Sequence, residues 1–155
     1  DFDRVDITNL HRQQYKANQI GRYKTEALAE NLQEIAPYIE LVTITKRITE
    51  TNVSSLLKDA DVVCEAFDDP EAKAMLVNAV LEQFPHTYLV AASGMAGMDT
   101  PNTIRTRKVT KHFYLCGDEI SDAADTIGLV APRVMLCAAH QAHTVLRILA
   151  DEFEV

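Results

Sequence analysis

The sequence predicts an α/β protein with a Rossmann-like, open and mainly parallel sheet and flanking helices. Short runs of β-branched residues alternate with segments of helical periodicity, an order typical of parallel strands joined by crossover helices. Acidic or small residues directly follow several of these runs, where the strands of such a sheet end and ligands collect. Hydrophobic residues make up 47% of the 155 residues and charged residues 25%, values that suit one domain over residues 1–155.

The first predicted element is a helix that follows the segment Asn18 to Tyr23. Five residues recur at helical spacing: Ala27, Leu28, Asn31, Leu32 and Ile35. Pro37 ends the helix, because proline cannot continue it. We expect the three larger apolar side chains, Leu28, Leu32 and Ile35, to face the sheet.

The middle of the chain predicts two strands separated by a short helix. Residues 41–46 alternate apolar and polar side chains as a strand does, and residues 53–58 form a short helix. Residues 61–66 are mostly apolar, which indicates a buried strand. We expect Cys64, inside this strand, to pack in the core.

A second long helix is predicted over residues 71–83. Pro70 can occupy its first turn, and the acidic residues Asp68 and Asp69 suit its positive N-terminus. The remaining predicted elements are strands over residues 86–93, 103–109 and 112–116, and a long helix within residues 130–151 that has Pro132 near its start.

Composition excludes several classes of protein. A net charge of −8 argues against a nucleic-acid or anionic-membrane surface, since both need clustered Lys and Arg. The apolar stretches are far shorter than the roughly 20 residues that cross a bilayer. Three separated cysteines, Cys64, Cys116 and Cys137, contain no Cys-x-x-Cys pair, which predicts a reducing, cytoplasmic location.

The opening of the chain carries the chemistry of a nucleotide site. Asp1 and Asp3 supply two carboxylates, and an amide, a guanidinium and a second amide follow in Asn9, Arg12 and Gln13. These groups can address a ribose, a base edge and a polyphosphate. In nucleotide-binding α/β folds an acidic residue at the end of the second strand accepts hydrogen bonds from ribose hydroxyls, and a glycine-rich turn precedes it by about 20 residues. Asp1 fits that position, so we expect an N-terminal portion with the glycine turn to be missing.

An ordered series of motifs resembles the ThiF/MoeB family, the adenylating enzymes related to ubiquitin activators. The series consists of Asp1 and Asp3, then Asn9-Leu10-His11-Arg12-Gln13, then Gly21-Arg22-Tyr23-Lys24, then Asp68 at the end of a later strand. The resemblance spans nearly the whole chain downstream of the family's glycine loop. A lone Gly-x-x-Lys would mean little, but the ordered series is specific.

The resemblance implies a role for each matched residue. Asp1 and Asp3 would hold the ribose, and Asn9, Arg12 and Lys24 would address the triphosphate. Asp68 would bind Mg²⁺, and Gln13 and Lys73 would have supporting roles. Attack of a carboxylate on the α-phosphorus needs cations to offset the charge on the phosphoryl oxygens and on the departing pyrophosphate. Arg12, Lys24 and a metal ion on Asp68 would supply them.

Two features of many family members are missing. Three scattered cysteines cannot build a four-thiolate zinc site, so we expect no structural zinc. The crossover segment, residues 118–127, contains no cysteine that could take over the activated group. Cys116 at its edge is the one candidate nucleophile, although most cysteines are small buried hydrophobic residues. Cys137, His140 and His143 recur along one helix but make an incomplete metal-ligand set.

The resemblance therefore implies a compact ThiF-type adenylyltransferase that uses Mg·ATP to adenylate the C-terminal carboxylate of a small ubiquitin-like sulfur carrier ending in Gly-Gly, in thiamine biosynthesis. It also implies a homodimer. Without the glycine loop, we expect these 155 residues alone to be inactive.

Three alternatives stay open. A dehydratase of the same superfamily would activate a tRNA-base carboxylate, but the acidic charge is unfavourable for tRNA. A dinucleotide-dependent oxidoreductase would use Asp1 but would leave Arg12 and Lys24 unexplained. A non-catalytic interaction module would fit a chain without the glycine loop.

Overall fold

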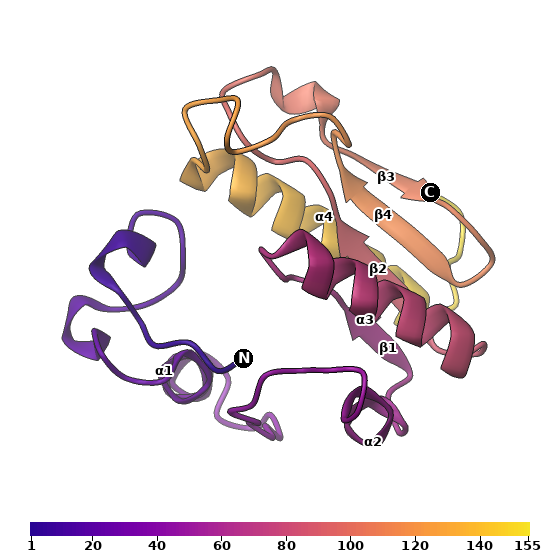
Figure 1. The fold of residues 1–155 in the computed structure, drawn as a ribbon, viewed down its shortest axis with the longest axis horizontal. Helices are drawn as coiled ribbons and strands as arrows, with labels where there is room; N and C mark the ends of the chain where they lie inside the picture. The colour runs from indigo at the N-terminus through magenta and orange to yellow at the C-terminus, as the bar shows by residue number, and fades with distance from the viewer. The chain divides into compact units, whose positions relative to one another are not determined.

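The computed structural model describes all residues 1–155, which divide into two compact units, Asp1–Ile48 and Thr49–Val155. Figure 1 shows the chain as a ribbon coloured from the N-terminus to the C-terminus. The division does not test the expectation of one adenylation domain over residues 1–155, which stays a prediction.

The first unit contains two 3₁₀ turns, η1 (Ile7–Asn9) and η2 (Ala17–Gln19), and the helix α1 (Lys24–Ile35). Residues 3–5 pair locally with residues 21–24: the Val5 N–H donates to Arg22 O at 2.8 Å and the Gly21 N–H donates to Val5 O at 2.8 Å. The predicted helix is confirmed, and it ends before Pro37 as expected.

The buried face of α1 differs from the predicted one. Ala27 and Asn31 are its buried residues, and the Asn31 amide exchanges hydrogen bonds with the buried amide of Gln19 at 2.9 and 3.2 Å. Leu28 is 38% exposed and Ile35 is 78% exposed, and Leu32 is only partly buried. These three side chains do not form the buried stripe of α1, because the amide pair selects the neighbouring stripe of the helix. Since α1 and the sheet belong to different units, the expectation that they face the sheet stays a prediction.

The strand predicted over residues 41–46 is wrong. The segment has no regular secondary structure and belongs to no sheet. Its contacts are single hydrogen bonds, from the N-terminal amine to Ile44 O at 3.5 Å and between the hydroxyls of Thr25 and Thr45 at 2.7 Å. Val42 is 89% exposed. Alternating polarity creates a strand only where a neighbour completes the ladder.

In the second unit the predicted order of elements is confirmed. Its helices are α2 (Val53–Leu57), α3 (Pro70–Gln83) and α4 (Ala131–Leu149), with a 3₁₀ turn η3 (Pro101–Thr103). Its strands are β1 (Val62–Cys64), β2 (Tyr88–Ala92), β3 (Arg105–Lys108) and β4 (Phe113–Gly117). Proline occupies the first turn of α3 and of α4, where its missing N–H removes no helical hydrogen bond.

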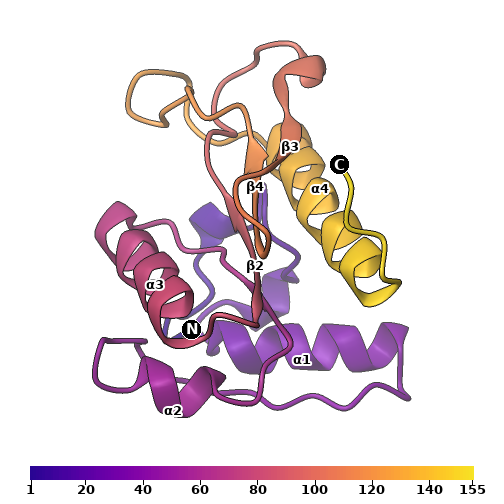
Figure 2. The ribbon, with the colours of Figure 1, turned by 90° about the vertical axis from the view of Figure 1, so that its right-hand side faces the viewer.

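The four strands form one sheet in the order β1-β2-β4-β3. β1 and β2 are parallel, as are β2 and β4, whereas β3 pairs with β4 in antiparallel fashion through a short reversal. The predicted mainly parallel sheet is therefore confirmed. Figure 2 shows the sheet nearly edge-on, with α3 on one face and α4 on the other. Both faces are covered, which explains the continuous apolar runs of β1 and β2.

The core of this unit lies between the sheet and α4. It consists of the buried residues Val90, Ala92, Ile104, Tyr114, Cys116, Cys137 and Ile148. Cys64 does not belong to it. The last residue of β1 is exposed, because β1 lies at the edge of the sheet and its buried side chain in this strand is Val63. The prediction that Cys64 packs in the core is wrong.

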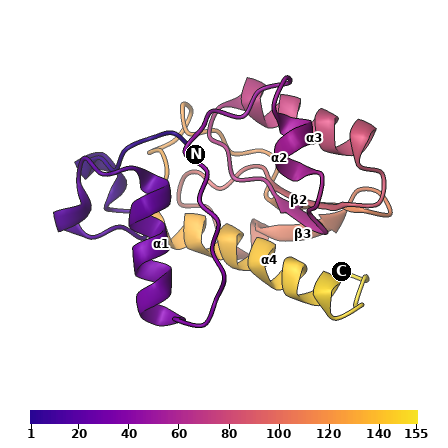
Figure 3. The same ribbon diagram turned by 90° about the horizontal axis from the view of Figure 1, so that it is seen from below.

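The C-terminal segment turns back after α4 (Figure 3). The Phe153 carbonyl accepts hydrogen bonds from Lys108 Nζ and Tyr114 Oη, both at 2.9 Å, and the Phe153 ring stacks on Tyr88 with centroids 5.6 Å apart. These contacts anchor the segment to β2, β3 and β4. None of the helices is long and apolar enough to cross a membrane.

Candidate functional site

The first unit brings two of the predicted residues into direct contact. Lys24 Nζ lies 3.0 Å from Asp3 Oδ2, and the Lys24 N–H donates to Asp3 O at 2.9 Å. Asp1 Oδ1 accepts the Asp3 N–H at 2.8 Å. Burial, helped by the Asp3 carboxylate, raises the pKa of Tyr15, so the phenol beside this cluster stays protonated. Asp1, Asp3 and Lys24 thus form one cluster of two carboxylates and an ammonium.

The second predicted group forms a tight turn. The Arg12 and Gln13 N–H groups both donate to Asn9 O, at 3.1 and 2.9 Å. Asn9 is buried, and its Oδ1 accepts the Asp6 N–H at 3.0 Å in a capping box around η1. Arg12 NH1 donates to Thr8 O at 2.7 Å. The amide of Asn9 is therefore engaged in shaping the turn that carries Arg12 and Gln13.

Gln13 carries the one buried side-chain oxygen of this unit that has no hydrogen-bond partner. Its Oε1 is buried and accepts no hydrogen bond from the protein. A buried carbonyl oxygen without a donor loses free energy unless a ligand or water supplies one. An amine or hydroxyl of a bound nucleotide has the chemistry to do so. Gln13 thus fits the predicted nucleotide site on an observation independent of its motif.

In the second unit Asp68 lies in the loop between β1 and α3. Its side chain is exposed and takes part in no hydrogen bond or ion pair. Asp69 is the N-cap of α3, and its Oδ2 accepts the Ala72 N–H at 2.7 Å. The two neighbouring carboxylates therefore have different tasks: Asp69 begins the helix and Asp68 is available to a ligand.

Sequence reasoning missed the residue that supports this loop. Glu65 is fully buried, and its carboxylate accepts Lys73 Nζ at 2.5 Å and the Phe67 N–H at 2.6 Å. Lys73 Nζ also donates to Ala92 O at 2.9 Å. A glutamate at the apolar end of a predicted buried strand was the available signal, since a buried carboxylate needs a partner.

The crossover segment packs closely on the end of β2. Asp118 Oδ1 accepts the N–H groups of Ile120 and Ser121, at 2.9 and 2.8 Å. A Cβ on Gly94 would lie 2.0 Å from that same oxygen. A neighbouring pocket of about 620 Å³ is lined by residues 96–99 and 117–121, among others. The segment after β4 is therefore fixed by a buried carboxylate and by the absence of a side chain at position 94.

The two buried cysteines are poorly suited to nucleophilic chemistry. Burial raises the pKa of the Cys116 thiol, which lies 3.6 Å from Thr106 Oγ1. Burial, helped by Cys116, raises the pKa of Cys137 to about 11. Thiolates are the reactive form of cysteine. The structure gives Cys116 the surroundings of a packing residue, and its role as a nucleophile stays a prediction.

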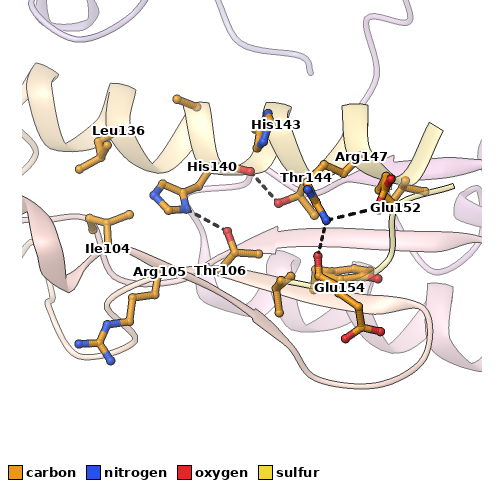
Figure 4. A pocket seen from close by; sticks show the side chains of 14 residues that line it. Ile104, Arg105, Thr106, Leu136, His140, His143, Thr144, Arg147, Glu152 and Glu154 are labelled. Carbon is orange, nitrogen blue, oxygen red and sulfur yellow. Dashed lines mark hydrogen bonds and ion pairs between the residues drawn. The ribbon is translucent and has the colours of Figure 1, made fainter. Parts of the chain in front are cut away.

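A larger pocket of about 830 Å³ lies between β3 and α4 (Figure 4). His140 Nδ1 and Thr106 Oγ1 are 2.9 Å apart across it, and Arg147 NH2 donates to Glu154 O at 2.9 Å. None of the predicted ATP or metal residues lines this pocket. His140 points to Thr106, and the buried Cys137 sulfur donates to Cys116 O at 3.5 Å, so the helix does not gather a metal-ligand cluster.

A magnesium ion at the nucleotide site would depend on the carboxylates that the chain offers as ligands. No group of three or more His, Cys, Asp or Glu side chains is placed to hold a metal ion. Mg²⁺ at nucleotide sites commonly needs just one or two carboxylates, because phosphates and waters fill the other positions. The exposed, unengaged carboxylate of Asp68 fits that requirement.

An open, mainly parallel sheet with helices on both faces and polar side chains at its carboxyl edge defines a protein of the Rossmann-like class. The model of the ThiF family matches residues 1–155, and the chain belongs to that family. The predicted family membership is therefore confirmed.

Among curated proteins, the chain is 29% identical over 158 residues to the sulfur carrier protein ThiS adenylyltransferase of Bacillus subtilis, covering 98% of this chain and 46% of that protein. It is 35% identical over 96 residues to the adenylyltransferase and sulfurtransferase UBA4 of Meyerozyma guilliermondii, covering 61% and 22%. The chain thus spans less than half the length of these relatives.

Among solved structures, the chain resembles the tRNA N6-threonylcarbamoyladenosine dehydratase TcdA of E. coli in complex with AMP, with a TM-score of 0.81 and 18% identity over 97% of this chain and 74% of that one. The ATP complex of the same protein gives a TM-score of 0.80. At this identity the likeness shows the fold, and it confirms the Rossmann-like class.

Proposed function

We propose that the whole protein containing this chain is an ATP-dependent adenylyltransferase whose substrate is the C-terminal carboxylate of a small ubiquitin-like sulfur carrier. The observation that carries the proposal is the cluster of Lys24 with Asp1 and Asp3. The same unit also contains the turn that carries Arg12 and Gln13, whose buried Oε1 has no hydrogen-bond donor. The names of the relatives, which include a ThiS adenylyltransferase, support the same reaction.

The residues of this chain have separable tasks in that reaction. Asp1 and Asp3 accept hydrogen bonds from the ribose hydroxyls, and Gln13 Oε1 accepts one from the nucleotide. Arg12 and Lys24 stabilise the charge that grows on the phosphoryl oxygens while the carboxylate attacks the α-phosphorus and the bond to pyrophosphate breaks. Lys24 would exchange part of its contact with Asp3 for the phosphate.

Asp68 would hold Mg²⁺, and the ion would neutralise phosphate charge and orient the triphosphate. The surroundings of Asp68 support this role, because the exposed carboxylate has no partner of its own while Asp69 caps α3. Adenylation would proceed without a thioester on Cys116, whose burial disfavours the thiolate.

The finer assignments belong to the same proposal. The carrier would end in Gly-Gly, since residues without side chains can thread a narrow passage, and the pocket beside the crossover segment offers room for such a tail. Thiamine biosynthesis, a cytoplasmic location and a homodimer complete the proposal, and sizing chromatography tests the dimer.

The test is ATP–pyrophosphate exchange by the complete protein with its carrier. Lys24→Ala and Asp68→Ala should each lower the exchange rate by about 100-fold or more, since the first removes a cation that stabilises the transition state and the second removes a ligand of the metal ion. Lys16→Ala and Asp59→Ala are matched controls, because both residues form exposed ion pairs, with Glu34 and Lys58. They should leave the rate unchanged.

Unchanged exchange in Lys24→Ala or Asp68→Ala would show that the role assignment is wrong. If the wild type exchanges only when tRNA replaces the carrier, the substrate is a tRNA-base carboxylate and the protein is a dehydratase. Exchange with neither substrate would leave a non-catalytic interaction module, and protection by NAD but not ATP in a thermal shift assay would indicate an oxidoreductase.

A further inference from the structure

The loop that carries Asp68 is fixed at both ends by buried or capped polar groups. At its start, the Glu65 carboxylate accepts the Phe67 N–H at 2.6 Å. At its end, Asp69 caps α3 through the Ala72 N–H at 2.7 Å. Asp68 lies between these two points, and its carboxylate is exposed and unengaged. Its position is therefore determined by its neighbours and not by contacts of its own.

Glu65 is itself held by the rest of the fold. Its N–H donates to Val90 O at 2.9 Å, which extends the pairing of β1 with β2. Its carbonyl accepts a hydrogen bond from Gln141 Nε2 of α4 at 2.8 Å. With a fully buried side chain, Glu65 is a rigid base for the loop.

Lys73 joins this base to the helix and to the next strand. Its ammonium lies 2.5 Å from Glu65 Oε2 and 2.9 Å from Ala92 O, the last residue of β2. Lys73 lies in the first turns of α3, so the ion pair fixes where α3 begins relative to the carboxyl ends of β1 and β2. Two of the three N–H groups of the ammonium are used in this way.

We propose that the ion pair between the buried Glu65 carboxylate and the partly buried Lys73 positions Asp68 for its metal ion. Neither residue touches the ion: both are positioning residues that act through the Phe67 N–H and the start of α3. The inference rests on the proposed function for the role of Asp68. That the ion pair fixes the position of the loop rests on the hydrogen bonds described above. Outer partners of metal ligands commonly change metal affinity by about 10- to 100-fold when they are removed.

A single substitution would confuse position with stability, because it leaves one buried charge without a partner. The informative variant is therefore the double one, Glu65→Gln/Lys73→Met. It keeps similar side-chain volumes and an acceptor for the Phe67 N–H, but it removes both charges and the bond to Ala92 O. The single variant Lys73→Arg keeps the charge and the hydrogen-bond donors of the lysine. Lys58→Met is the control, since Lys58 is an exposed lysine of the same unit.

Two measurements on the complete protein test the inference. The first is Mn²⁺ affinity at saturating ATP, read by electron paramagnetic resonance. The second is amide hydrogen exchange of residues 66–69, read by mass spectrometry. In the double variant we expect Mn²⁺ to bind about tenfold more weakly or worse and the loop to exchange faster, with the urea midpoint close to that of the wild type. The single variant Lys73→Arg should retain most of the wild-type affinity for Mn²⁺.

The outcomes separate this inference from the proposed function. If Asp68→Ala weakens Mn²⁺ binding but the double variant does not, the positioning role is wrong. If Asp68→Ala leaves Mn²⁺ binding unchanged, the metal role in the proposed function is wrong. Amide hydrogen exchange of residues 66–69 then decides by itself whether the ion pair holds the loop. Unchanged amide hydrogen exchange of residues 66–69 in the double variant overturns the inference in either case.

Discussion

Arg133 and Asp118 form an ion pair in which only 5% and 6% of the two side chains are exposed, with NH2 and Oδ2 2.5 Å apart. Arg133 NH1 also donates to Asp99 O and Thr100 O, at 2.9 and 3.1 Å. The pair therefore joins the start of α4 to the end of β4 and to the loop after β2. One guanidinium connects three segments that are far apart in sequence.

We expect Asp118→Asn and Arg133→Met each to destabilise the fold by about 3–5 kcal/mol, because each leaves the other charge buried without its partner. The double variant should cost clearly less than the sum, since it leaves no charge behind. Urea unfolding of the complete protein measures all three. Additive costs would show that the two side chains act independently.

Stability should also depend on pH through Asp118. Burial disfavours its charged form, but hydrogen bonds from Ser121 and Ile120 and the charge of Arg133 outweigh burial, so the pKa of Asp118 is lowered. A lowered pKa gives stability that is fully present above the usual carboxyl value near 3.9 and is lost as the pH falls through the lower folded-state value. Urea midpoints between pH 5 and pH 2 should fall less steeply in Asp118→Asn than in the wild type. Equal slopes would contradict this.

Two glycines with positive φ offer a matched comparison. A Cβ on Gly117, at φ +136°, would lie 1.8 Å from Ser93 O, whereas a Cβ on Gly128, at φ +87°, would meet nothing within 4 Å. Gly128→Ala should cost about 1–2 kcal/mol, the penalty of the left-handed conformation alone. Gly117→Ala should cost about 1–3 kcal/mol more, because the backbone must also shift. Thermal unfolding distinguishes the two, and equal losses would rule out a steric role for position 117.

The three thiols should react in a defined order with a disulfide reagent. Cys64 is exposed, although partial burial of its thiol raises the pKa, while Cys116 and Cys137 are buried. We expect one thiol to react in the native protein, faster as the pH approaches 9, and three in denaturant. Cys64→Ser should abolish the native reaction. A thiol that still reacts quickly in this variant would revive Cys116 as a nucleophile.

Hydrophobic periodicity and the positions of the prolines were enough to predict most of the helices and strands of the second unit. Pro70 and Pro132 mark the starts of α3 and α4, and the apolar runs give β1, β2 and β4. These signals are local, so they can be recognised in the sequence without knowledge of the tertiary structure.

What the sequence could not predict depends on partners distant in the chain. The segment 41–46 has the pattern of a strand but no neighbour that completes a ladder, and Cys64 is exposed because β1 lies at the edge of the sheet. The amide pair of Gln19 and Asn31 decides which stripe of α1 is buried. None of these pairings leaves a periodic trace in the sequence.

The predicted site residues show the same limit. The motif series indicated Lys24 and Asp3 separately, and the structure joins them in an ion pair. The motif series did not include Glu65, whose only signal was its place at the end of a predicted buried strand. A motif resemblance proposes residues for ligand contact more readily than it reveals the residues that hold them in place.

The two edges of the sheet are chemically unlike. β3 presents Arg105, Arg107 and Lys108, and cationic side chains on an edge repel an incoming strand. β1 is the uncharged run Val62–Cys64, and only β2 pairs with it. The cationic edge formed by β3 thus disfavours pairing with a further strand, whereas the edge formed by β1 carries no such charge.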